Sequence, residues 1–181
     1  MNYYDIIAAV PALAFGMPPP MTLEAFIQTC EGRMPSGDEA ELAHFVAGDF
    51  HACRSDFSRN WASVEQSLRN EVAGLRAARW KVDPAPYAQY GQGYDSFIDR
   101  TVVDAYTKSN PREREQVLDQ ARWHVLEDLV VPTPFGLAAI LATGEKLRIM
   151  NRWSRLREDK GWERLDEAIN TLLTSAGVPS P

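Results

Sequence analysis

One stripe of apolar side chains constrains the fold of this chain more than any other feature of its sequence. Five apolar residues recur at spacings of three and four, namely Trp61, Val64, Leu68, Val72 and Leu75. That spacing places them on one side of an α-helix, whereas a period of two would have indicated a strand. The stripe therefore predicts a long helix whose apolar side is packed in a core.

Start and stop signals predict two helices before this one. Thr22 can cap a helix that ends near Gly32. Ser36 and Glu39, three residues apart, have the form of a capping box, and the helix that they begin stops near Gly48. The stretch at residues 3–10 is apolar but short, so both a strand and a buried helix stay open for it.

Three further helices and a last C-terminal one are expected in the second half. A short helix is predicted by Phe97, Ile98 and Val102. Asn110 can cap a long helix that has Pro111 in its first turn and ends at Pro132. The next helix runs from Phe135 toward Trp153. A last helix, ending near residue 177, is predicted by Leu165, Ile169, Leu172 and Leu173.

These signals predict an all-α fold, a single irregular bundle of about six to seven helices with two sub-bundles as an option. Residues 1–181 are expected to form one helical domain. The loop at residues 83–94 holds two prolines and two glycines and is the candidate sub-domain break. Gly144, inside a predicted helix, costs about 1 kcal/mol relative to alanine and indicates close packing of a neighbouring helix.

Composition limits the classes of function. The formal net charge is -6 and the pI is near 5.1, so there is no general electrostatic attraction to nucleic acid. No apolar run approaches the roughly 20 residues of a membrane-spanning helix. Two cysteines, Cys30 and Cys53, are too few for a disulfide framework. We expect a cytoplasmic protein that reaches the inner membrane only through partners.

The candidates for catalysis or metal binding are few. No nucleophile with a recognisable motif is present, so the sequence predicts a non-catalytic protein without a cofactor. His44 and His51 lie seven residues apart and near Cys53, which keeps a small helical metal-binding protein or enzyme open as the alternative. The spacing lacks the close ligand pairs typical of zinc, and Gly48 can end the helix between the two histidines. Ordinary structural histidines are the favoured interpretation.

A row of arginines is the candidate site for binding a partner. Arg148, Arg152 and Arg155 are spaced by four and three, so all three point from one helix face. Guanidinium groups in a row can clamp carboxylates of a partner protein or contact phosphates. The competing interpretation is a solvated face neutralised by three acids, Glu145, Glu158 and Asp159.

Two other charged groups need an interpretation. The earlier arginines Arg69, Arg76 and Arg79 invite the same two interpretations as the later row. Three acids of the predicted helix after Asn110 look like first-turn charge and a solvated face, namely Glu113, Glu115 and Asp119.

Two stretches resemble known proteins. The first is formed by Tyr3-Tyr4, Val10-Pro11-Ala12-Leu13, Phe15-Gly16, Pro18-Pro19-Pro20, Phe26, Cys30, Leu68-Arg69-Asn70 and Leu75-Arg76-Ala77. It resembles a family of uncharacterised bacterial proteins that tend to be encoded among the subunits of V/A-type ATPases. The resemblance implies that the protein works with those subunits.

The second stretch is formed by Pro134-Phe135-Gly136-Leu137, Glu145, Arg148, Asn151 and Trp153. It is similar to a helix of the central-stalk subunit of V/A-type ATPases, called C in prokaryotes and d in eukaryotes. The chain is about half as long as that three-lobed subunit, so the resemblance implies a shortened stalk-like protein. It would be a non-catalytic subunit or an assembly or coupling factor. Its partners would be subunits on the rotor-shaft and membrane-ring side of a proton- or sodium-translocating ATPase.

Overall fold

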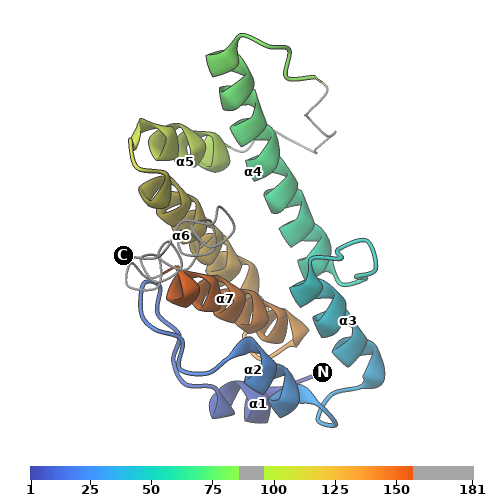
Figure 1. The fold of residues 1–181 in the computed structure, drawn as a ribbon. Coiled ribbons are helices and arrows are strands. Elements are labelled where there is room, and N and C mark those ends of the chain that lie inside the picture. Colours follow the sequence, from blue (N-terminus) through green and yellow to red (C-terminus); the bar gives the residue numbers. More distant parts are fainter. Residues whose placement is uncertain (86–95, 157–181) are drawn as a thin grey trace, which may run out of the picture.

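The computed structural model describes residues 1–85 and 96–156, and these form helices without any strand among them (Figure 1). The helices are α1 (Tyr4–Ala9), α2 (Leu23–Cys30), α3 (Ser36–Ala47), α4 (Asp56–Trp80), α5 (Ser96–Thr107), α6 (Pro111–Val130) and α7 (Leu137–Arg155). The predicted all-α class is confirmed. The expected last helix and most of the loop at residues 83–94 lie outside the described residues.

Most of the predicted helix ends are present. Thr22 caps α2, with its hydroxyl oxygen accepting a hydrogen bond from the Ala25 N–H at 3.1 Å. Asn110 caps α6 in the same way, accepting from the Arg112 N–H at 2.9 Å. Gly48 ends α3 with a φ of 78°, a left-handed conformation that favours glycine.

The predicted capping box is wrong. Ser36 is the first residue of α3 rather than its cap, since Pro35 occupies the capping position and makes no side-chain hydrogen bond there. The Glu39 carboxylate instead accepts a hydrogen bond from the Gly32 N–H at 2.7 Å. This acid therefore ties the turn after α2 to α3, a tertiary contact that the local pattern does not reveal.

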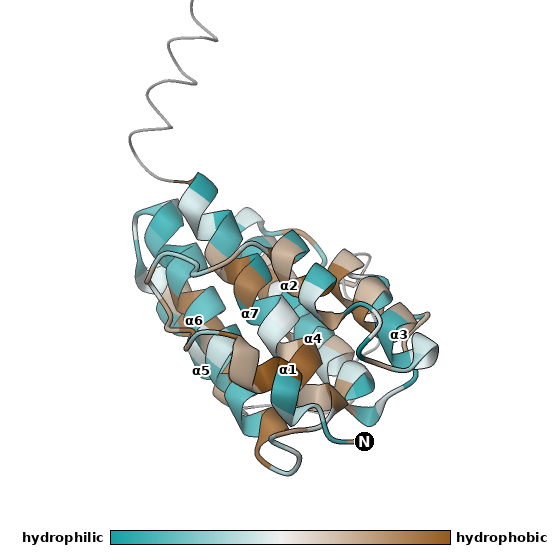
Figure 2. Cartoon of the chain, turned by 90° about the horizontal axis from the view of Figure 1, so that it is seen from below, coloured by the Kyte–Doolittle hydropathy of each residue, from teal (hydrophilic) through white to brown (hydrophobic). Residues whose placement is uncertain are grey.

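Two apolar cores run along the molecule. The larger one joins α1, α2, α3 and α7 with the first turns of α4 and the end of α6, and its largest fully buried side chains include Trp61, Phe26 and Phe45. The smaller one, between α4, α5 and α6, contains Leu68, Ile98, Val102, Ala105 and Leu118. Seen from below, apolar residues gather between the helices and polar ones outside (Figure 2). Helix α4 contributes its apolar stripe to both cores.

Helix α7 lies at the centre of the larger core and contacts α2, α3 and α6. A Cβ at Gly144 would lie 3.0 Å from Val46 Cγ1 and 3.3 Å from Leu42 Cδ1. The close helix packing that this glycine indicated is confirmed. The tight contact holds α7 against α3. The arginines near the C-terminal end of α7 are exposed at the surface.

Among the described residues, no helix combines the length and the apolar character that crossing a membrane requires.

Candidate interaction site at the end of α7

The three predicted arginines line one depression at the surface. Arg148, Arg152 and Arg155 surround a cavity of about 500 Å³ together with Leu23 and Glu24 of α2. We call this cavity the α7 groove. The expectation that the three side chains share one face is confirmed, while their role in binding a partner stays a prediction.

A buried carboxylate holds Arg148. Its Nε and Nη2 donate to the two oxygens of Glu145 at 2.7 and 2.5 Å, and the Glu145 side chain is fully buried. The hydrogen bonds that Arg148 donates to this carboxylate raise the pKa of Arg148 more than burial lowers it. The Arg148 side chain is 48% exposed, so its inner edge is bound while its outer edge faces solvent.

A second buried carboxylate holds Arg152. Asp119 of α6 accepts hydrogen bonds from Arg152 Nη2, from Trp153 Nε1 at 2.7 Å and from Arg122 Nη1 at 3.0 Å. Its side chain is almost fully buried. The prediction that Asp119 belongs to a solvated face is therefore wrong. The reason is its position on α6, four residues before the buried Trp123.

Arg122 of α6 connects Asp119 and Arg152 to helix α4. Its Nε donates to Glu65 at 2.6 Å and its Nη2 donates to the other oxygen at 3.4 Å. Burial lowers the pKa of Arg122, but Glu65 and Asp119 outweigh that effect and the pKa is raised. The arginine thus stays charged and joins three helices through two acids.

Together these side chains form what we call the carboxylate network, namely Glu65, Asp119, Glu145, Arg122, Arg148 and Arg152. It contains three acids and three arginines, so its formal charges cancel. The interpretation that acids neutralise the arginine row is correct for Glu145 and Arg148. The acid that neutralises Arg152, Asp119, was not predicted. The other two acids of that interpretation, Glu158 and Asp159, lie outside the described residues.

Pairing leaves part of each guanidinium available. Within residues 1–85 and 96–156, no acceptor is seen for Arg148 Nη1 or for Arg152 Nε and Nη1. Each of these N–H groups belongs to a guanidinium that is already hydrogen-bonded to a buried acid through its other N–H groups. The arrangement can present donors to a carboxylate or phosphate with little further loss of side-chain freedom.

Arg155 differs from its two neighbours in the row. It is exposed, and no ion pair links it to the described part of the chain. Glu24, across the α7 groove, has a lowered pKa, mainly through its own backbone N–H and the Thr22 hydroxyl and less through Arg155. Among the described contacts, Arg155 is thus the one arginine of the row that no ion pair holds.

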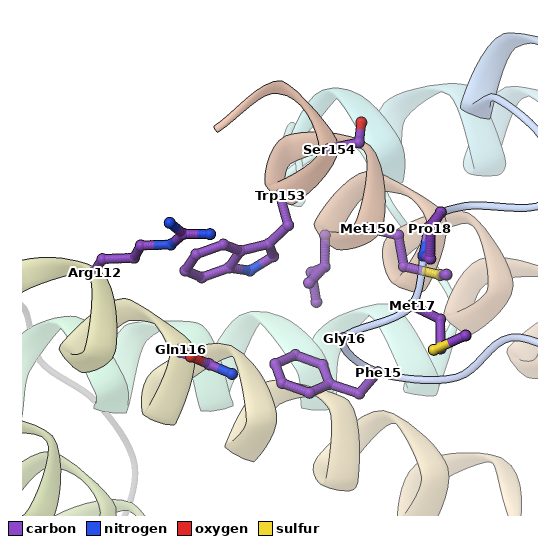
Figure 3. Close-up of a pocket in the computed structure, with 10 residues that line it drawn as sticks. Phe15, Gly16, Met17, Pro18, Arg112, Gln116, Met150, Trp153 and Ser154 are labelled. Atoms are coloured by element: carbon purple, nitrogen blue, oxygen red, sulfur yellow. The ribbon is translucent and has the colours of Figure 1, made fainter. Parts of the chain in front are cut away.

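A second depression of about 300 Å³ flanks α7 on its Trp153 side (Figure 3). The Arg112 guanidinium of α6 lies 6.0 Å from the centre of the Trp153 ring, within cation–π range. Phe15 and Met17, from the segment after α1, line the same hollow. Trp153 is thus fixed at its Nε1 edge by Asp119, and one face is covered by Arg112.

The residues of the metal-binding alternative do not converge. Helix α3 ends before Gly48, so His44 and His51 do not share one helix, as the glycine suggested. His44 Nδ1 lies 3.2 Å from Asp49 Oδ2 at the surface. Across the described ranges, no three His, Cys, Asp or Glu side chains gather in a way that could hold a metal ion.

The buried acids left a signal in the sequence that residue-by-residue reading missed. Glu65 comes four residues after the buried Trp61, and Glu145 comes four residues after the buried Leu141. Asp119 has the same spacing to Trp123. An acid in register with an apolar stripe points into the core, where it needs a cationic partner.

Comparison with known proteins gives a likeness to one family over part of the chain and no activity. No curated protein and no solved structure matches the chain. One family model matches residues 89–176, just under half of the chain, and its description is "Protein of unknown function (DUF2764)". The match spans α5, α6 and α7, so it includes Asp119, Glu145 and the arginine row but not Glu65. Over this stretch the chain is similar to that family.

Proposed function

We propose that the protein is a non-catalytic subunit or assembly factor of a V/A-type ATPase. The α7 groove would bind an acidic segment of another subunit. The observation that carries this proposal is the anchoring of Arg148 and Arg152 by buried carboxylates around one surface depression. The class of partner rests on the sequence resemblance to the central-stalk subunit.

The anchoring supports binding rather than catalysis. An exposed arginine loses rotamer freedom when it binds, which reduces its net contribution to affinity. Arg148 and Arg152 have already lost much of that freedom inside the protein. A partner carboxylate can then meet fixed N–H donors, which favours bidentate recognition.

A stalk role places few chemical demands on the chain. Such a subunit seats a rotor shaft on a membrane ring, so it needs a stiff helical body and polar contact surfaces. The central position of α7 and its tight packing at Gly144 supply stiffness at the base of the groove. The partner would be a subunit on the rotor-shaft or membrane-ring side.

The test must separate binding from folding. Reversing the charge of Arg148 or Arg152 would place a carboxylate beside a buried acid and unfold the site, so these variants are uninformative. Arg155→Glu changes the groove without breaking a described ion pair. We expect it to weaken co-purification with co-expressed ATPase subunits by about 10-fold, the effect of ~1.4 kcal/mol. Its helical circular dichroism should stay unchanged.

Arg33→Glu is the matched control, since Arg33 is an exposed arginine beyond the other end of α2. It should assemble like the wild-type protein. Normal assembly of Arg155→Glu would remove the α7 groove from the proposal. Failure of the wild-type protein to co-purify with any ATPase subunit of its own operon would overturn the proposed function itself.

A further inference from the structure

A second groove lies between the C-terminal half of α4 and the N-terminal half of α6. It has a volume of about 530 Å³, and its apolar floor is formed by Leu68, Val72, Ala73, Ala77 and Leu118. An adjoining depression of about 360 Å³ shares Arg76, Trp80, Glu115 and Leu118 with it. Because they share these lining residues, we call the two depressions together the α4 groove.

The floor of the α4 groove includes Leu68 and Val72 of the stripe that predicted a buried helix. Leu68 is 1% exposed, but Trp80 at the end of the same helix is 72% exposed and Val82 just beyond it is 47% exposed. The smaller core covers Leu68 and packs against Val72 and Leu75, but it does not cover Trp80 and Val82 beyond the stripe. A large exposed indole beside an apolar floor is typical of a surface that another molecule covers.

The rim of the α4 groove is strongly basic in an acidic protein. Five arginines and one acid, Glu115, line the two depressions. Arg122 is paired with Glu65 and Asp119. The other four are Arg69, Arg76, Arg79 and Arg114. The described residues supply no ion pair to any of the four. Arg76 donates to the Tyr106 hydroxyl at 2.8 Å, and Arg114 donates to the Lys108 carbonyl at 2.8 Å. These neutral acceptors hold two of the side chains without cancelling their charge.

Shape and charge together specify an occupant. From Leu68 to Trp80 the floor follows twelve helical steps, or ~18 Å, the length of about three turns of a helix. We propose that the α4 groove binds an amphipathic helix of a partner protein that carries acidic residues beside its apolar face. Helix-in-groove binding places an apolar stripe on the floor, and the flanking carboxylates then meet the arginines.

This inference is independent of the proposed function. The α4 groove and the α7 groove share no lining residue. A single-stranded nucleic acid could also stack on Trp80, but the net charge of -6 opposes long-range attraction of a polyanion. The acidic helix satisfies both the apolar floor and the basic rim.

The first experiment uses the full chain and a labelled synthetic peptide of about four helical turns, with leucines at helical spacing and glutamates beside them. Fluorescence anisotropy should show that it binds at least ~10-fold more tightly than the same peptide with lysines in place of the glutamates. Arg69→Glu/Arg79→Glu should weaken binding by about 10-fold or more. Arg33→Glu/Arg54→Glu changes the net charge equally on other exposed arginines and should leave the affinity unchanged.

The outcomes that would overturn the inference are specific. They are equal affinity for the two peptides, unchanged affinity in Arg69→Glu/Arg79→Glu, or tighter binding of a labelled oligothymidylate than of the acidic peptide. A photo-crosslinking amino acid in place of Trp80 gives a second measurement in cells. Cross-links to an acidic helix of another protein support the proposal. The control carries the same photo-crosslinking amino acid in place of the exposed Glu113. The proposal is overturned if position 80 gives only cross-links within the chain, or no more cross-links than position 113.

Discussion

The two arginine-rich faces of this protein look alike in sequence and differ in structure. On α7, Arg148 and Arg152 bind buried carboxylates. On α4, Arg69 and Arg79 border an apolar groove and form no ion pair with a described residue. Helical spacing predicts which face a side chain occupies. The neighbouring helix decides whether that face is part of the structure or a free surface.

The difference has an energetic consequence. A buried carboxylate without its cation costs several kcal/mol, because the charge has lost its hydration. Removing the charge of an exposed arginine changes the free energy of unfolding only a little. Substitutions in the carboxylate network should therefore affect stability, whereas substitutions around the α4 groove should affect binding.

The largest expected effect is that of Asp119→Ala. It removes the acceptor of Arg122, Arg152 and Trp153 at once and leaves the largely buried Arg122 with Glu65 alone. We expect the free energy of unfolding to fall by about 3–5 kcal/mol, the range for breaking a buried pair. Urea unfolding followed by circular dichroism measures this change.

Glu115→Ala is the matched control, because Glu115 is an exposed acid on the same helix. It should change the free energy of unfolding by no more than about 0.5 kcal/mol. Arg152→Gln should cost less in the Asp119→Ala background than in the wild type, since the two side chains form one pair. An Asp119→Ala protein as stable as the Glu115→Ala protein would show that the network is not structural.

The fold was largely predictable from local patterns. The stripe from Trp61 onward and the caps at Thr22 and Asn110 are properties of single helices, so the sequence suffices for them. The common face of the arginine row was predictable for the same reason. The capping box failed because Glu39 makes its contact with Gly32 of the preceding turn.

The candidate site was only half predictable. Arg152 and Asp119 are 33 residues apart, and Arg122 and Glu65 are 57 residues apart, on helices whose relative positions no local pattern specifies. The α4 groove was not predicted either. The apolar stripe is packed against the two cores as predicted, but Trp80 and Val82 beyond it are exposed, and no local pattern shows which side of α4 the neighbouring helices leave open.

A carboxylate outside both arginine sets separates the effect of burial from that of ion pairing. Glu41 is buried and accepts hydrogen bonds at 2.8 Å from the Ser55 N–H and the Ser58 hydroxyl. Burial raises its pKa, but the hydrogen bonds from Ser55 and Ser58 outweigh burial and lower it. We expect Glu41→Gln to reduce the free energy of unfolding at neutral pH by about 1–3 kcal/mol.

The effect of Glu41→Gln should depend on pH with a defined sign. Because the folded state lowers the pKa of this carboxyl, its stabilising effect is present above the ordinary value of 4.5. It is lost as the pH falls through the lowered pKa. The stability difference between wild type and variant should therefore shrink in acid, as measured by urea unfolding across a pH series. A difference that stays constant would rule out ionised Glu41 as its source.

The smallest expected effects compare the two arginine sets directly. Arg152→Gln should lower the free energy of unfolding by only ~1 kcal/mol, because the side chain is 45% exposed and Asp119 keeps Arg122 and Trp153. Arg69→Gln should change it by no more than about 0.5 kcal/mol. In a domain of this size ~1 kcal/mol shifts the melting temperature by about 2–4 °C, so differential scanning calorimetry can separate the two variants. Equal shifts would mean that anchoring to a buried acid adds nothing, and the two faces would then be equivalent surfaces.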